Sequence, residues 1–258
     1  MKLRAWGLTD VGQKREHNED SLLVLEDVGL FAVADGMGGH TGGDRASGMA
    51  VEILEREMRK VDMASLAASG AGLGPDGDDP PGQALERAAR AAGRAIYDAA
   101  NADTSLAGMG TTLTAMLIFG GRLYLAHVGD SRAYLYRDDR LEQLSVDHTW
   151  IEEQVRAGFM TPEEASNSDL RHIVTRSVGY ERDVRVDRLA MPTLMGDCFV
   201  LCSDGLSNYI DERELRTYMQ GNYYSELPRL LVDGANQLGG EDNITCVVVY
   251  VANDGSDG

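Results

Sequence analysis

The 258-residue sequence is poor in basic residues and in long apolar runs. It holds 24 lysines and arginines against 42 aspartates and glutamates, which gives a formal net charge of −18. Nucleic acids and anionic membranes bind to basic surfaces, so this balance argues against both as the main partner. No apolar run approaches the length of a membrane span, and the N-terminus has no apolar signal region. We therefore expect a cytoplasmic protein.

Cysteine is scarce as well, since only Cys198, Cys202 and Cys246 occur, each in an apolar, strand-like run. The odd number and the spacing do not suggest a disulfide framework, which favours a reducing compartment. Cys198 and Cys202 would share one face of a strand, as a metal-binding pair would. Unpaired cysteine is among the most buried residue types, however, so we expect plain buried thiols.

Aspartates next to apolar strands are the main feature that the sequence does have. Asp35, Asp130 and Asp204 each follow an apolar run, and Asp242 precedes the last one. In an antiparallel sheet the start of one strand lies at the same edge as the end of its neighbour, so the four can meet at one rim. For each aspartate alone, an ordinary turn is the simpler explanation. The recurrence of the pattern favours a common site.

Such a cluster of carboxylates predicts a metal centre, because crowded carboxylates repel one another unless a cation neutralises them. All the donors are oxygens, and no spacing of histidine or cysteine accompanies them, so Mg²⁺ or Mn²⁺ is favoured over Zn²⁺. Two ions about 3.5–4 Å apart could share a carboxylate and a water, which would become a hydroxide nucleophile near neutral pH. The pattern therefore suggests metal-assisted hydrolysis of a phosphoester.

A polar segment near the N-terminus adds a candidate phosphate ligand. Arg15 lies close in sequence to Glu19 and Asp20. A guanidinium presents a planar fork of donors that matches phosphate oxygens. The alternative is a solvated loop of mixed charge.

Periodicity predicts two amphipathic helices, at residues 44–61 and 83–101, separated by a flexible insertion at about 62–82 that is rich in Gly, Ala, Asp and Pro. The whole chain is consistent with one domain over residues 1–251 and an acidic tail at 252–258. Strands are expected at 3–9, 21–26, 31–35, 111–119, 122–128, 133–137, 184–189, 197–203 and 244–251.

A long excursion between strands covers about residues 145–179. Thr149 and Thr161 are each followed three residues later by glutamate, a capping-box pattern that predicts two short helices. Excursions of this length are often mobile covers over a site.

Six motifs stand in order along the chain: Arg15-Glu-His-Asn-Glu-Asp20, Asp35-Gly-Met-Gly-Gly-His40, Gly110-Thr-Thr112, Val128-Gly-Asp-Ser-Arg132, Ser203-Asp-Gly205 and Asp242-Asn-Ile-Thr245. With them the chain resembles the bacterial metal-dependent Ser/Thr protein phosphatases of type 2C, over about residues 3–251. The resemblance implies an α+β fold, a four-layer α-β-β-α sandwich of two antiparallel sheets. It also implies metals in a cleft at one sheet edge and a flap at about 145–179.

The resemblance also implies which residues bind the ions. Asp35 would bridge both core ions, Mn²⁺ or Mg²⁺, and Gly36 would offer its carbonyl to one. Asp204 and Asp242 would ligate the other. Asp130 matches the residue that, with Asp204, holds a third and weaker ion in bacterial members of the family.

Further roles follow from the same resemblance. Arg15 matches the phosphate-binding arginine, while Glu19 and Asp20 match an acidic pair that acts directly or through metal-bound water. Some eukaryotic members carry a histidine after the Asp-Gly pair as a proposed general acid, where this chain has Met37. The acid is thereby unassigned, and either a water on a third metal or His40 could supply the proton.

The expected activity is hydrolysis of phosphoserine and phosphothreonine in proteins by a metal-bridged hydroxide. This would reverse signalling by a bacterial Ser/Thr kinase, with the kinase and its substrates as partners. One alternative is a catalytically silent phosphoprotein-binding module on the same fold. Another is a hydrolase for a nucleotide or phospholipid, although no basic or aromatic base-binding stretch accompanies the acidic rim.

Overall fold

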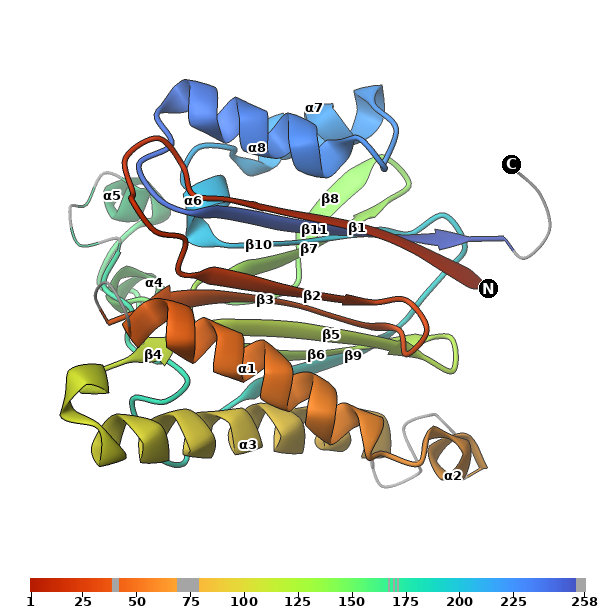
Figure 1. Ribbon diagram of the computed structural model, residues 1–258. Helices are drawn as coiled ribbons and strands as arrows, with labels where there is room; N and C mark the ends of the chain where they lie inside the picture. The colour runs from red at the N-terminus through yellow and green to blue at the C-terminus, as the bar shows by residue number, and fades with distance from the viewer. Residues whose placement is uncertain (39–41, 69–78, 167, 169, 171, 254–258) are drawn as a thin grey trace.

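The chain forms two antiparallel β-sheets packed face to face, with helices on both outer faces (Figure 1). The computed structural model describes residues 1–38, 42–68, 79–166, 168, 170 and 172–253. A buried apolar layer lies between the sheets, and each sheet has a second apolar layer beneath its helices. The predicted four-layer α-β-β-α sandwich is therefore confirmed.

The first sheet has the order β1-β11-β10-β7-β8, and every neighbouring pair in it is antiparallel. In that order, its strands span Lys2–Asp10, Ile244–Ala252, Cys198–Cys202, Arg132–Arg137 and Arg140–Gln143. All residues of β10 and most of β11 are buried, so these two strands form the centre of the sheet.

The second sheet has the order β2-β3-β5-β6-β9, and the short strand β4 pairs with the end of β3. In that order, the five strands span Asp20–Leu25, Leu30–Met37, Leu113–Phe119, Arg122–Val128 and Asp187–Pro192, and β4 is Gly110–Thr111. The predicted hairpin between β5 and β6 is confirmed, with residues 120–121 as its turn.

Helices α1 (Gly42–Arg59) and α3 (Pro80–Ala102) cover the outer face of the second sheet (Figure 1). On the other side, α7 (Glu212–Gly221) and α8 (Leu227–Leu238) cover the first sheet, with the short α6 (Asp204–Ser207) beside them. The remaining helical segments are α2 (Met63–Ala68), η1 (Thr104–Leu106), α4 (Trp150–Arg156) and α5 (Pro162–Ser166).

Two local predictions differ from the structure, and one strand was missed. The segment expected as an insertion at 62–82 contains α2 and the first turn of α3, and residues 69–78 lie outside the described part. Strand β8 was not predicted. The strand expected at 184–189 lies at 187–192 instead. Val184 and Val186 alternate because both pack under α3 in the helix-covered core, not because they belong to the sheet.

Cys198, Cys202 and Cys246 are buried and unpaired, as predicted. Thr149 and Thr161 each accept a backbone hydrogen bond from the residue three positions on, at the starts of α4 and α5. In the described part of the chain, no helix is both long enough and apolar enough to cross a membrane.

Candidate metal centre

Asp35 lies inside β3 rather than at its end, because β3 continues to Met37 and pairs there with β4. Its backbone is fixed from both sides by Thr112. The Thr112 amide donates to the Asp35 carbonyl at 2.8 Å, and the Asp35 amide donates to the Thr112 hydroxyl at 2.9 Å. The expectation of a strand-end aspartate is thus wrong for Asp35, although its side chain still reaches the acidic rim.

The other three predicted aspartates lie where their strands meet the same edge of the sandwich. Asp130 is in the turn between β6 and β7, Asp204 is the first residue of α6 after β10, and Asp242 comes shortly before β11. A cavity of about 710 Å³ opens at this edge. Its lining brings together Arg15, Glu19, Asp35, Gly36, Asp130, Asp204 and Asp242.

The carboxylates of this cavity are crowded enough to resist ionisation. Burial, followed by repulsion from Asp20 and Asp204, raises the pKa of Asp35 well above its ordinary value. Burial and then repulsion from Asp204 and Asp147 raise the pKa of Asp130 to about 7. The pKa of Asp204 is raised by burial and by repulsion from Asp242, and the hydrogen bond from Asn208 offsets this in part.

One atom of the cluster has no partner. Asp204 Oδ1 is buried without a hydrogen bond in the described structure, while Oδ2 accepts from Asn208 Nδ2 at 3.1 Å. A buried acceptor without a donor costs free energy, and a second negative charge close by increases that cost. A divalent cation, which prefers oxygen ligands, would remove both penalties. The donor set therefore fits Mg²⁺ or Mn²⁺.

Asp20 belongs to a second layer behind the cavity. It pairs with Asp35 in the β2–β3 register, and its Oδ2 accepts from the Ser203 and Thr245 hydroxyls at 2.8 and 2.6 Å. Burial raises its pKa to about 7, although these two hydrogen bonds lower it in part. Glu19, its neighbour in sequence, does line the cavity.

Arg15 is paired with Asp242. Its guanidinium donates to Asp242 Oδ2 at 2.8 Å, with both side chains partly exposed. Among the described residues, no three side chains of Asp, Glu, His or Cys form a ready metal-binding group. The carboxylates thus line the cavity but do not converge on one point. A cation that binds Asp242 has to compete with Arg15.

The backbone around Gly36 is packed so closely that only glycine fits. A Cβ built on Gly36 would lie 2.1 Å from the Gly43 carbonyl oxygen and 2.5 Å from that of Glu19. This close approach fixes the peptide next to Asp35. His40, the candidate general acid, lies outside the described residues.

Asn243 helps to build the site, although the motif that contains it was given without a role for this residue. The Asn243 side chain accepts from the Glu19 amide at 2.8 Å and donates to the Val11 and His17 carbonyls at 3.0 and 2.9 Å. It thereby holds the loop that carries Arg15 against the start of β11. His172, from the segment after α5, lines the cavity as well.

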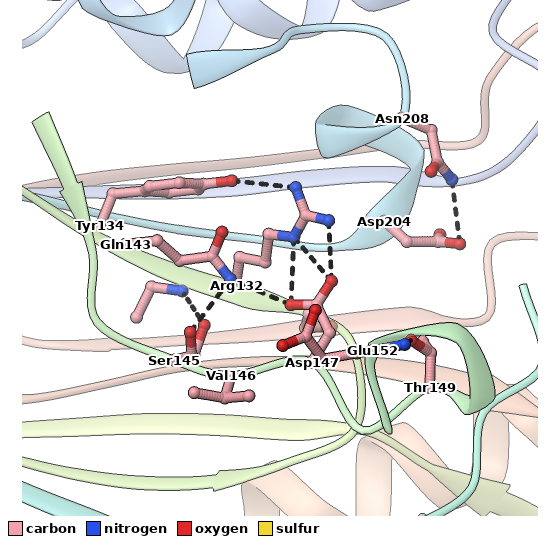
Figure 2. A network of polar contacts seen from close by, with 12 residues as sticks. Arg132, Tyr134, Gln143, Ser145, Val146, Asp147, Thr149, Glu152, Asp204 and Asn208 are labelled. Atoms are coloured by element: carbon pink, nitrogen blue, oxygen red, sulfur yellow. Dashed lines mark hydrogen bonds and ion pairs between the residues drawn. The ribbon is translucent and has the colours of Figure 1, made fainter. Parts of the chain in front are cut away.

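Figure 2 shows a second group of contacts beside the aspartates, in which the Arg132 guanidinium lies between the Tyr134 hydroxyl and the Asp147 carboxylate. These residues were not predicted as functional. Arg132, Asp147 and Thr149 line a smaller cavity of about 170 Å³ that also reaches Asp130 and Asp204.

Comparison with known proteins agrees with this geometry. The family model of protein phosphatase 2C matches residues 12–230. The serine/threonine phosphatase stp of Listeria innocua is 37% identical over 245 residues, which cover 93% of each chain. The crystal structure of the Mycobacterium tuberculosis serine/threonine phosphatase PstP/Ppp is 36% identical, with a TM-score of 0.83 over 98% of this chain and all of that one.

A solved structure of the catalytic domain of serine/threonine protein phosphatase PstP is described as a complex with two manganese ions. It is 35% identical, with a TM-score of 0.83, and covers 98% of this chain and 99% of that one.

The fold and the acidic cavity are thus those of a metal-dependent phosphatase. This chain belongs to the protein phosphatase 2C family, and it is a metal-dependent protein phosphatase. The resemblance drawn from the six motifs is therefore confirmed, and so are the enzyme class and the two-ion cofactor.

Proposed function

We propose that this protein removes phosphate from phosphoserine and phosphothreonine in proteins, in the cytoplasm, and so reverses the action of a bacterial Ser/Thr kinase on itself and its substrates. The observation that carries the proposal is the Asp204 carboxylate, whose buried Oδ1 has no hydrogen-bond partner among the described residues and lies close to other acids. Relatives named as serine/threonine phosphatases support the substrate class and argue against a silent binding module.

We assign the ion ligands to the rim of the cavity. Asp35 would contact both core ions, with the Gly36 carbonyl on one of them and Asp204 and Asp242 on the other. Asp130, together with Asp204, would hold a third and weaker ion. When bound, Mn²⁺ or Mg²⁺ activates water for attack and neutralises charge on the phosphoryl group.

The chain's own residues would bind and orient the substrate. Arg15 stands half exposed at the cavity, so its guanidinium can exchange the Asp242 carboxylate for phosphate oxygens. Glu19 lines the cavity and would act directly or through water, whereas Asp20 would position Ser203 and Thr245 behind the ions. His40 remains a candidate for the proton donor.

We also take residues 145–179 as a flap beside the cleft, within one phosphatase domain over residues 1–251. Two observations support this assignment. In its described part the segment holds the short helices α4 and α5 and isolated β-bridges, and His172 and Val174 from it line the cavity. The flap would then contact the protein substrate next to the phosphorylated side chain.

The test is hydrolysis of a phosphothreonine peptide, p-nitrophenyl phosphate and a nucleotide, each titrated with Mn²⁺ and Mg²⁺. We expect metal-dependent turnover of the first two. Removing a residue that only orients a metal ligand costs roughly 10–100-fold in activity. Asp242→Asn should lower activity by more than this, with an unchanged circular dichroism spectrum. Full activity after exhaustive chelation, or faster turnover of the nucleotide than of the peptide, would contradict the proposal.

A further inference from the structure

The direction of the Asp130 side chain is set by its turn. Asp130 is buried, with 8% of its surface exposed. Among the described residues, no side chain of another residue donates a hydrogen bond to its carboxylate. Its position therefore depends on whatever fixes the backbone on either side.

His148 holds the residue before Asp130 at two points. The His148 amide donates to the Gly129 carbonyl at 2.8 Å, and the Gly129 amide donates to His148 Nδ1 at 2.9 Å. Gly129 has a φ of +111°, and a Cβ there would lie 2.6 Å from the Thr112 side chain. The turn is therefore tight, and His148 satisfies both of its backbone groups.

The His148 ring is itself held at both nitrogens. Nδ1 accepts from Gly129, while Nε2 lies 2.9 Å from Arg176 Nη1 and 3.3 Å from Asp187 Oδ2. Arg176 donates to the other oxygen of Asp187 at 2.8 Å. Burial, followed by the charge of Arg176, lowers the pKa of His148, which keeps the ring neutral. This chain of contacts resembles the second-shell partners that orient ligands in metal sites.

Asp147 holds the chain on the other side of Asp130. Its carboxylate accepts from Arg132 Nε at 2.9 Å and from Arg132 Nη2 at 2.7 Å, and Gln143 donates to it at 3.0 Å (Figure 2). Asp147 is mostly buried, so this forked pair is less screened than a surface salt bridge. Two adjacent residues therefore hold the turn from both sides.

We propose that Asp147 and His148 are positioning residues for an ion at Asp130, since they fix Gly129 and Arg132 on its two sides. The proposal rests on the ion position at Asp130 assigned under the proposed function.

His148 and the two residues after it connect the turn at Asp130 to the flap. The His148 carbonyl accepts from the Thr175 amide at 2.8 Å, and Thr149, the next residue, caps α4. Trp150 donates to the Ile173 carbonyl at 2.9 Å, so the outgoing and returning limbs of residues 145–179 are joined here. A displacement of the flap base would therefore reach Asp130 through His148.

The test is calorimetric titration of the metal-free full chain with Mn²⁺, compared with Asp130→Asn, which defines the Asp130-dependent binding event. Removing a residue that orients a metal ligand costs roughly 10–100-fold in metal affinity. We expect His148→Leu and Asp147→Asn to weaken that event about tenfold or more, while the tighter events stay within about threefold of the unaltered protein. His148→Asn places an acceptor where Nδ1 lies, so it should keep the affinity.

A matched control is available at the far end of β7. Arg137 binds the buried Asp197 through two contacts of 2.6 Å, the same forked geometry as Arg132 with Asp147. Asp197→Asn should lower the melting temperature without changing Mn²⁺ affinity. Equal weakening by Asp197→Asn and Asp147→Asn would overturn the proposal, because general destabilisation would then explain the effect.

Other outcomes are equally decisive. The proposal is overturned by a folded His148→Leu protein that binds Mn²⁺ normally, or by the absence of any Asp130-dependent event in the unaltered protein. If His148→Leu does not fold, the contrast between Asp147→Asn and Asp197→Asn decides. Normal Mn²⁺ binding without turnover of phosphopeptide would contradict the proposed function and leave this inference intact.

Discussion

The Arg15 guanidinium donates a hydrogen bond to the Asp242 carboxylate at 2.8 Å at the edge of the acidic cavity. The Arg15 side chain is 50% exposed and that of Asp242 is 38% exposed, so water screens the pair. Exposed pairs of this kind contribute about 0–1 kcal/mol. Ion binding at Asp242 and phosphate binding at Arg15 can therefore each separate the pair at small cost.

Replacing Arg15 with alanine separates the effect of Arg15 on ion binding from its effect on phosphate binding. Without its competitor, Asp242 should bind Mn²⁺ unchanged or up to about fivefold more tightly, which corresponds to about 1 kcal/mol. The kcat/KM for a phosphothreonine peptide should fall about 10–100-fold, because a charge-assisted hydrogen bond contributes roughly 1.5–3 kcal/mol. Calorimetry and steady-state kinetics measure the two changes. Weaker Mn²⁺ binding by Arg15→Ala would show that Arg15 supports the ion site instead of competing with it.

The close packing at Gly36 predicts a strong effect of a single methyl group. Gly36→Ala places a Cβ against the carbonyl oxygens of Gly43 and Glu19, and such backbone contacts cannot move aside without shifting the site. We expect a loss of about 3 kcal/mol or more in the free energy of unfolding, measured by urea denaturation.

Gly48 in α1 provides the control, because a Cβ there would have no atom within 4 Å. Gly48→Ala should stabilise the protein by roughly 0.5–1 kcal/mol through helix propensity alone. Equal unfolding free energies for the two variants would contradict the packing described around Gly36.

His127 predicts a loss of stability in acid. It is buried, with Nδ1 3.0 Å from the Thr114 hydroxyl and Nε2 3.0 Å from the Val146 carbonyl. Burial is the main reason why its pKa is lowered to about 3, while Asp187 acts in the opposite direction. The unfolded chain takes up the proton first, so stability is fully present above the ordinary pKa of about 6.5 and falls as the pH drops towards 3.

At pH 5 the stability lost in this way amounts to about 2 kcal/mol, since pH 5 lies about 1.5 units below the ordinary pKa and each unit is worth about 1.4 kcal/mol. His127→Gln keeps a donor towards the Val146 carbonyl and cannot be protonated, so it should lose less stability between pH 7 and pH 5. Urea unfolding in the presence of a chelator measures the free energy of unfolding of both proteins at the two pH values. The contributions of the carboxylates are common to both proteins and cancel in the comparison. The same pH dependence in both proteins would refute the role of His127.

The six ordered motifs predicted the fold through their resemblance to a known family. Most of the acidic rim was predicted directly, because carboxylates next to buried strands are visible in a one-dimensional pattern. The sequence did not predict their supports, since those partners are far apart in the chain. Thr112 lies 77 positions from Asp35, and Asn243 lies 224 positions from Glu19. The pairing of Arg15 with Asp242 could not be predicted either, because it depends on how the loop at Arg15 lies against β11.

The central claim is that the acidic rim is held together by divalent cations, and Asp204 tests it most directly. Asp204→Asn removes a charge that now repels the Asp35 carboxylate, and the new amide can donate a hydrogen bond to Asp35. The measurement is the melting temperature of both proteins with chelator and with Mn²⁺. We predict that without metal the variant melts at the same temperature as the unaltered protein or higher, while only the unaltered protein gains stability from Mn²⁺. A variant that melts lower without metal and responds to Mn²⁺ like the unaltered protein would contradict the claim.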